Sequence, residues 1–189
     1  MFSIHSDRAR GHAPKSTLLR LLAVSAIGVL AVLAGATSAS AAVTHTTFAF
    51  VSPHIAGAPT GSVAMVGSGN YDTPTGPLHA NGFFQCTASV AQGQGPLAGC
   101  LKGQGVFWNS TTLNPTQRFV CRTDAPKTVT TDDKTVAFNA NFYRAGDVTP
   151  SFRANVIVSA HDIAPDVQGV QNTWIQGVGC GSALQTFAS

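Results

Sequence analysis

The residues best suited to acid–base chemistry lie in the segment SAHDIAPD, residues 159–166. His161 stands beside Asp162, and Asp166 follows four residues later, so the segment could supply an acid/base pair or a cation-binding loop. Adjacent residues on an extended chain point in opposite directions, so His161 and Asp162 act together only if the chain turns there. The structural alternative is that an Asp side chain caps a short turn, and we favour this interpretation.

A metal site would need three or four ligands that converge. The chain has histidines at 45, 54, 79 and 161 after its first 41 residues, and none lies within five residues of another. The segment GSGNYDTPTG, residues 67–76, offers closely spaced oxygen atoms, but it lacks the calcium-loop pattern and the chain contains no Glu. We therefore predict no metal ligands and no cofactor, and we interpret residues 67–76 as a surface turn.

The chain has four cysteines, which are Cys86, Cys100, Cys121 and Cys180. No pair has the C-x-x-C spacing of redox enzymes and zinc knuckles. An even number of cysteines in an exported chain indicates two disulfides, for which three connectivities are possible. We favour Cys86–Cys100 with Cys121–Cys180, because the first two lie on strand-like runs that flank one turn-rich segment; the other connectivities remain open.

Export is indicated by residues 1–41. This segment contains four basic residues, an uncharged run from Leu21 to Ala36, and small residues at Ala39 and Ala41, which together are typical of a secretory signal peptide. The uncharged run is shorter than the roughly 20 residues that cross a bilayer as a helix. We expect cleavage after Ala41, a secreted, extracellular domain over residues 42–189, and no membrane span in that mature chain.

The charge of the mature chain argues against a nucleic-acid partner. The whole chain carries a formal charge of +3, but residues 42–189 contain seven Lys and Arg against seven Asp. The seven basic residues are scattered singly, whereas binding to phosphates requires a basic stripe or patch. We predict no nucleic-acid binding and a surface covered mainly by uncharged polar residues.

The elements that must position these groups are β-strands. Apolar and polar residues alternate in GFFQCTASV, TVAFNANFY and RANVIVSAH, as they do in strands with one buried face. Further candidate strands cover residues 44–51, 62–67, 105–109, 117–123 and 172–179, and turn-rich segments separate them. We predict an all-β fold, a single antiparallel β-barrel or β-sandwich of about eight strands, stapled by two disulfides.

Two aromatic doublets interrupt the alternation. Phe83–Phe84 and Phe107–Trp108 each place two large apolar side chains next to each other, so one side chain of each pair must leave the face that the other occupies. The outward residue then meets solvent, a ligand or a second buried layer. We take Phe83, Phe107, Trp108 and Trp174 as the candidate ligand-binding residues.

The leader with AVLAGATSASA, the Glu-poor β pattern, the four cysteines and the ending WIQGVGCGSAL resemble small secreted proteins of high-GC Gram-positive bacteria that have no assigned activity. The resemblance implies an extracellular β domain and no catalytic residue.

The leading functional hypothesis is a secreted, non-enzymatic β domain that binds a small apolar ligand, an envelope component or a protein partner. One alternative is an extracellular enzyme, either a β-barrel isomerase or cyclase or a hydrolase that uses Asp and His161. Another is a secreted inhibitor that presents the loop of residues 91–99.

Overall fold

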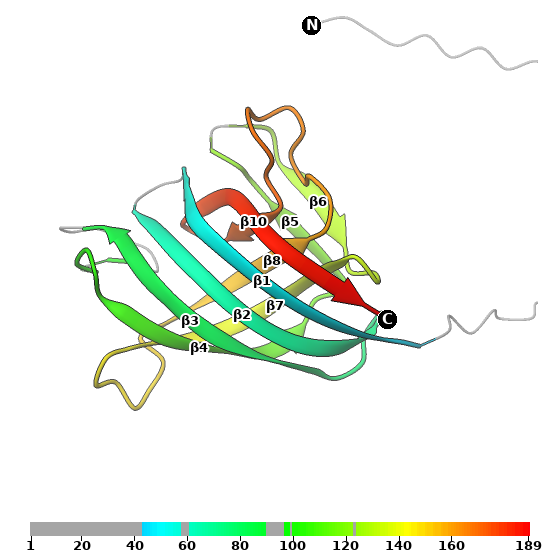
Figure 1. Ribbon diagram of the computed structural model, residues 1–189, viewed down its shortest axis with the longest axis horizontal. Coiled ribbons are helices and arrows are strands. Elements are labelled where there is room, and N and C mark those ends of the chain that lie inside the picture. The colour runs from blue at the N-terminus through cyan, green and yellow to red at the C-terminus, as the bar shows by residue number, and fades with distance from the viewer. Residues whose placement is uncertain (1–42, 58–60, 90–96, 99, 123) are drawn as a thin grey trace, which may run out of the picture. The chain divides into compact units, whose positions relative to one another are not determined.

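The computed structural model describes residues 43–57, 61–89, 97–98, 100–122 and 124–189 (Figure 1). The predicted signal peptide, residues 1–41, lies outside the described residues. The part that is described contains no helix that is long and apolar enough to cross a membrane. Its strands are β1 (Thr44–Gly57), β2 (Ser62–Thr73), β3 (Leu78–Ala88), β4 (Gly105–Leu113), β5 (Thr116–Phe119), β6 (Lys127–Thr130), β7 (Thr135–Arg144), β8 (Phe152–Ser159), β9 (Thr173–Ile175) and β10 (Gly179–Ala188).

Eight of the strands close into an antiparallel barrel in the order β1-β10-β9-β8-β7-β4-β3-β2 (Figure 1). The remaining two, β5 and β6, form a separate two-stranded sheet. The predicted all-β class is confirmed, and of the two architectures that we considered the structure adopts the barrel. Closure pairs every barrel strand on both sides, which removes exposed sheet edges.

Several strands extend beyond their predicted ranges. β1 continues past Val51 to Gly57, and β2 continues past Gly67 to Thr73, so residues 67–73 are strand and the prediction of a surface turn there was wrong. The strands β6 and β10 were not expected as separate elements. Gly, Asn and Ser weaken an isolated strand signal, but here β2 pairs with both β1 and β3 along this stretch.

Aromatic rings fill the inside of the barrel. Phe48, Phe50, Trp108, Phe138 and Phe142 are each at most 4% exposed. The Trp108 ring stacks on Phe138 with a centroid distance of 5.6 Å and lies 6.2 Å from Phe50. The interior is therefore a packed core, as is common for small barrels.

Two glycines make room for Trp108. A Cβ atom at Gly67 would lie 2.1 Å from the Trp108 ring, and one at Gly82 would lie 2.0 Å from the Val66 carbonyl oxygen and 2.8 Å from Trp108 Nε1. The indole Nε1 donates a hydrogen bond of 3.1 Å to that same Val66 oxygen. The large ring on β4 thus contacts the backbone of β2 because β3 has no side chain at residue 82.

A second, smaller apolar cluster connects the β5–β6 sheet to the barrel. It contains Phe119, Ile157, Ala164 and Trp174, together with the disulfide between Cys121 and Cys180. Trp174 Nε1 donates a hydrogen bond of 3.0 Å to the carbonyl oxygen of Val120. These contacts hold the two-stranded sheet against β8, β9 and β10.

The favoured disulfide connectivity is confirmed. Cys86 pairs with Cys100 across 14 residues, with Cα atoms 6.4 Å apart, and Cys121 pairs with Cys180 across 59 residues, with Cα atoms 5.4 Å apart. Neither pair is a reactive thiol or a metal ligand, because all four sulfurs are in disulfides.

Candidate functional site

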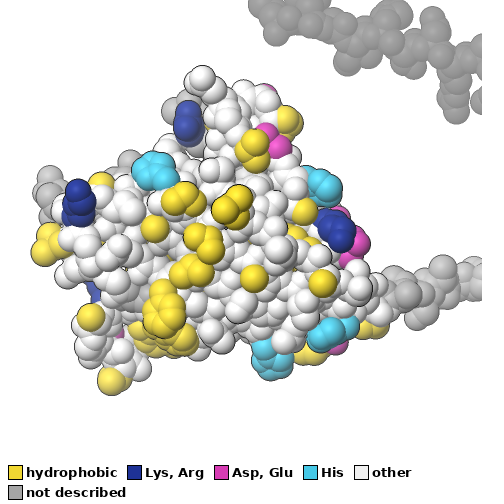
Figure 2. Space-filling view, in the orientation of Figure 1, with side chains coloured by type: hydrophobic (Ala, Val, Ile, Leu, Met, Phe, Trp, Pro, Cys, Tyr) yellow, Lys and Arg dark blue, Asp and Glu magenta, His cyan; other side chains and the backbone are white. Residues whose placement is uncertain are grey.

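A continuous row of apolar side chains crosses the outer surface of six neighbouring strands. Each member faces the next in direct cross-strand register, from β10 through β1, β2, β3 and β4 to β7. Figure 2 shows a band of apolar side chains across one face of the molecule, with charged groups mostly at its periphery. We call this set the outer row; its members are Leu184, Val51, Val66, Phe83, Phe107 and Tyr143.

Five members of the outer row are exposed, and Tyr143 is half-buried. Leu184 is 82% exposed, Phe83 65% and Phe107 41%, whereas one neighbour of each on the same strand is buried: Ala183, Phe84 and Trp108. Residues directly opposite each other on antiparallel strands have Cβ atoms about 5 Å apart, so the side chains form an unbroken apolar surface. Since scattered single apolar residues are the norm on a protein surface, a row in register is the informative feature.

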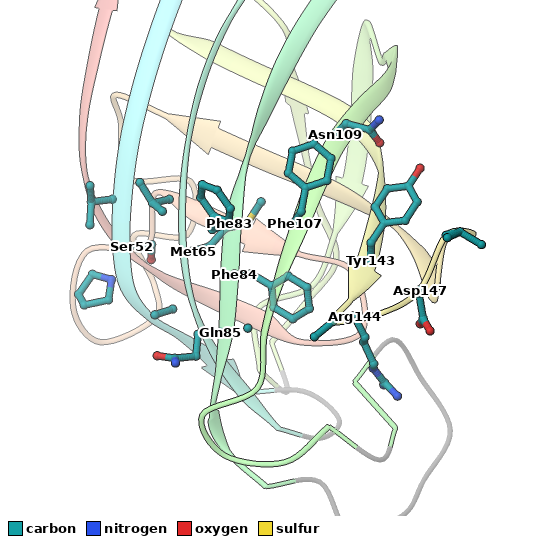
Figure 3. A pocket seen from close by; sticks show the side chains of 17 residues that line it. Ser52, Met65, Phe83, Phe84, Gln85, Phe107, Asn109, Tyr143, Arg144 and Asp147 are labelled. Atoms are coloured by element: carbon teal, nitrogen blue, oxygen red, sulfur yellow. The ribbon is translucent and has the colours of Figure 1, made fainter.

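Aromatic rings occupy one end of the outer row. Phe83 and Phe107 meet edge to face with ring centroids 6.3 Å apart, and Phe107 and Tyr143 lie 5.9 Å apart (Figure 3). These spacings lie within the range of favourable aromatic pairs. The three rings support one another and present their remaining faces outward.

The aromatic end of the row borders a groove of about 870 Å³. Its lining comes from β1 to β4, from β7 and from the β7–β8 connection, which contributes Ala145, Asp147 and Val148. Figure 3 shows Asp147 near Arg144 and Tyr143. A second hollow of about 550 Å³ shares Val51, Val66 and Phe83 with this groove. Both volumes fall in the range of small-molecule sites, and both lie along the outer row.

Charged groups lie only at one end of the groove. Arg144 Nη2 donates a hydrogen bond of 2.5 Å to the carbonyl oxygen of Ala98, and Asp147 accepts one of 2.6 Å from Ser151 Oγ. No ion pair joins Arg144 to Asp147 among the residues that the structure describes. The outer row itself carries no charged side chain at neutral pH, so its surface favours an uncharged ligand.

The structure separates the four aromatic residues that we proposed as ligand contacts. Phe83 and Phe107 lie in the groove, as that hypothesis requires. Trp108 is 0% exposed inside the barrel, so it belongs to the core rather than to an exposed site. Trp174 is 6% exposed and packs against Phe119 with ring centroids 5.9 Å apart; it borders a different hollow of about 490 Å³.

The possible acid/base set is not assembled. Asp162 Oδ1 accepts hydrogen bonds from the backbone N–H groups of Ala164 at 3.0 Å and Gln171 at 3.2 Å, as in the structural interpretation of this turn. Asp166 instead pairs with Lys127 at 2.6 Å, on the side of the β5–β6 sheet. His161 is exposed and does not line the groove or the hollows of about 550 and 490 Å³.

Among the described residues, no three His, Cys, Asp or Glu side chains lie close enough together to hold a metal ion. His45 Nδ1 lies 2.7 Å from Asp72 Oδ1 across β1 and β2, which ties two strands together. Most of the 91–99 loop, the segment of the proposed inhibitor, lies outside the described residues.

Sequence reasoning missed four members of the outer row, although a signal was present. Val51, Val66, Tyr143 and Leu184 each follow a buried apolar residue, just as Phe83 and Phe107 adjoin one. Each of the six strands therefore carries an apolar doublet with one residue inside and one outside. The doublets are Phe50–Val51, Met65–Val66, Phe83–Phe84, Phe107–Trp108, Phe142–Tyr143 and Ala183–Leu184.

Comparison with known proteins gives no relative: no protein-family model, curated protein or solved structure matches this chain.

Proposed function

We propose that this protein is exported and acts as a non-enzymatic binding module, which holds an uncharged ligand against the outer row. One observation carries the proposal: the outward halves of six apolar doublets lie in register across six strands and border two hollows. Export is supported by the signal-like leader and by two disulfides, which persist in oxidising compartments.

The outer row is not part of the buried core. The barrel core is filled by the inward residues, such as Phe84, Trp108 and Phe142, each at most 2% exposed. Phe83 and Phe107 lie outside that core, and exposed aromatic side chains promote aggregation. A ligand that covers them gains roughly 25 cal/mol for each Å² of apolar surface removed from water.

The location of the ligand follows from the same packing. Since aromatic rings occupy the inside of the barrel, we place the ligand on the outside, between strands β1–β4 and the β7–β8 connection. Backbone atoms of paired strands form a rigid floor there, so binding requires little reordering of the protein.

The test uses the neutral fluorescent dye Nile red as an apolar probe and the exported protein. We expect saturable binding, which the double variant Phe83→Ser/Phe107→Ser weakens at least tenfold. Val170→Ser is the matched control, because Val170 is an exposed apolar residue, 54% accessible, away from the outer row. Near-ultraviolet circular dichroism monitors the fold of each variant. Equal binding by the double variant and the wild type would overturn the proposal.

A further inference from the structure

A second row of outward side chains runs beside the outer row, two residues away from it on each strand. On the three strands that carry the aromatic rings, this position is an asparagine: Asn81 on β3, Asn109 on β4 and Asn141 on β7. Asn81 pairs with Asn109, and Asn109 pairs with Asn141, in direct register. We call these three residues the amide row; it lies about 7 Å from the aromatic rings, the rise of two strand residues.

The amide row has hydrogen-bonding capacity that the described residues do not use. Asn109 Oδ1 and Asn141 Oδ1 are covered by protein, and neither has a hydrogen-bond partner among the residues described. The Asn81 side chain is exposed, and Asn109 also lines the groove (Figure 3). An amide side chain offers two donor hydrogens and an acceptor oxygen, so the exposed Asn81 both donates and accepts, whereas the covered oxygens leave Asn109 and Asn141 only their amide N–H groups for a ligand.

The two rows together specify the chemistry of a ligand. Phe83, Phe107 and Tyr143 require an apolar face, and the adjacent asparagines require groups that donate and accept hydrogen bonds without charge. From Val66 to Tyr143 the outer row crosses four strands, about 14 Å along the curved surface. This length suits an elongated ligand of several linked units.

Deepening the proposed function, on which this inference rests, we propose that the ligand is a neutral oligosaccharide. The C–H faces of its sugar rings stack on Phe83, Phe107 and Tyr143. Its hydroxyl groups exchange hydrogen bonds with the exposed Asn81 and accept hydrogen bonds from the amide N–H groups of Asn109 and Asn141. Each hydroxyl is both donor and acceptor, which matches an amide, and each sugar ring has one apolar face, which matches the aromatic row.

Other ligand classes match only one of the two rows. A plain alkyl chain would leave the amides without partners where it covers them, which costs free energy. An anionic ligand would need Lys or Arg beside the rings. Arg144 at the end of the groove already donates to a backbone carbonyl, and Arg153 on β8 pairs with Asn141 at the end of the amide row, not with an aromatic residue. A polymer of neutral sugars uses both rows along its whole length.

The experiment measures the binding of two neutral hexasaccharides, cellohexaose and hexa-N-acetylchitohexaose, to the ¹⁵N-labelled exported protein by nuclear magnetic resonance. We expect saturable shifts of amide signals of residues 81–85, 105–109 and 141–143 with at least one of them. The variants Asn109→Leu and Asn81→Leu are nearly isosteric and remove only the amide chemistry. We expect each to weaken sugar binding at least fivefold without weakening Nile red binding, because Leu adds apolar surface at the two hollows that Asn109 and Asn81 line.

The readouts separate this inference from the proposed function. The oligosaccharide proposal would be contradicted if neither sugar bound saturably, or if both Asn variants bound sugar as well as the wild type. In either case, retained Nile red binding would still support the proposed function. If the wild type did not bind Nile red, the proposed function itself would be contradicted. Asn81 is exposed, so Asn81→Leu preserves a test even where Asn109→Leu disturbs the paired strands.

Discussion

The indole Nε1 of Trp108 donates a hydrogen bond of 3.1 Å to the carbonyl oxygen of Val66, across the glycine at position 82. This bond connects the packed inside of the barrel to the strand that displays Val66 on its outside. The core ring therefore fixes the backbone under the middle of the outer row. The same relationship makes the shape of the outer surface depend on a residue that is itself fully buried.

We expect Gly82→Ala to lower the free energy of unfolding by about 3 kcal/mol, because the new Cβ collides with backbone and with the Trp108 ring. Gly105→Ala is the matched control, since the nearest heavy atom, the Phe84 oxygen, lies 3.8 Å from the position of its Cβ. Urea unfolding followed by tryptophan fluorescence measures both. A Gly82→Ala protein as stable as Gly105→Ala would contradict the described packing.

The adjacent phenylalanines at 83 and 84 should respond oppositely to truncation. Phe84 is 2% exposed and Phe83 is 65% exposed. We expect Phe84→Ala to cost about 3–5 kcal/mol of stability, as for other buried aromatic residues, and Phe83→Ala to stay within about 0.5 kcal/mol. Thermal unfolding compares the two variants. If Phe83→Ala were the more damaging, the assignment of inner and outer faces on β3 would be reversed.

The Asp162 carboxylate should matter for stability more than its neighbour His161 does. Asp162→Ala removes the acceptor of two backbone hydrogen bonds and should cost about 1 kcal/mol. His161→Ala removes an exposed ring and should change stability by less than about 0.5 kcal/mol. Thermal midpoints of the two variants give the comparison, and a larger loss for His161→Ala would point to a role for His161 that the described contacts do not contain.

The two disulfides should contribute unequally. In the chain-entropy model, closing the 59-residue separation of Cys121–Cys180 is worth about 4 kcal/mol, and the 14-residue separation of Cys86–Cys100 about 3 kcal/mol. We expect Cys121→Ala/Cys180→Ala to be the less stable double variant, also because it removes one of the contacts that hold the β5–β6 sheet against the barrel. The urea concentrations at the unfolding midpoints of both double variants decide the order. We expect the reduced wild type, which lacks both disulfides, to have a lower midpoint than either variant.

The ion pairs of Lys127 should give a defined pH dependence. Lys127 lies between Asp124 and Asp166, and its ammonium group lowers the pKa of Asp124 below the ordinary 3.8, while the carboxylates raise the pKa of Lys127 above 10.5. A lowered carboxyl pKa stabilises the folded state at pH values above the pKa of the unfolded chain. This stabilisation is lost as the pH falls through the pKa of the folded state. A raised ammonium pKa stabilises the folded state below pH 10.5, and this stabilisation is lost as the pH rises through the folded-state pKa.

The stability difference between the wild type and Lys127→Met should therefore be constant from about pH 5 to pH 9 and shrink below about pH 4. The three groups lie at the surface, with Asp166 exposed and Lys127 and Asp124 partly covered, so we expect a small difference that decreases further with added salt. Urea unfolding across this pH range measures it. A difference that grew on acidification would contradict the ion-pair arrangement.

The sequence by itself determined the class of the fold and the role of the sulfurs. Two-residue alternation in segments such as TVAFNANFY is a local property that needs no partner to be recognised, and it predicted strands that the structure contains. The doublets Phe83–Phe84 and Phe107–Trp108 also showed locally that one ring of each pair must point outward, although not which one.

Only the tertiary structure decided that the sheet closes into a barrel, that Trp108 lies inside it, and that six outward residues form one row. Register between strands depends on pairing across up to 141 residues of sequence, as between Thr47 and Ala188, and no local pattern encodes it. A shift of one residue in any strand would move its outward residue to the other face. The outer row is therefore a property of strand register, which arises only when the whole barrel packs around its aromatic core.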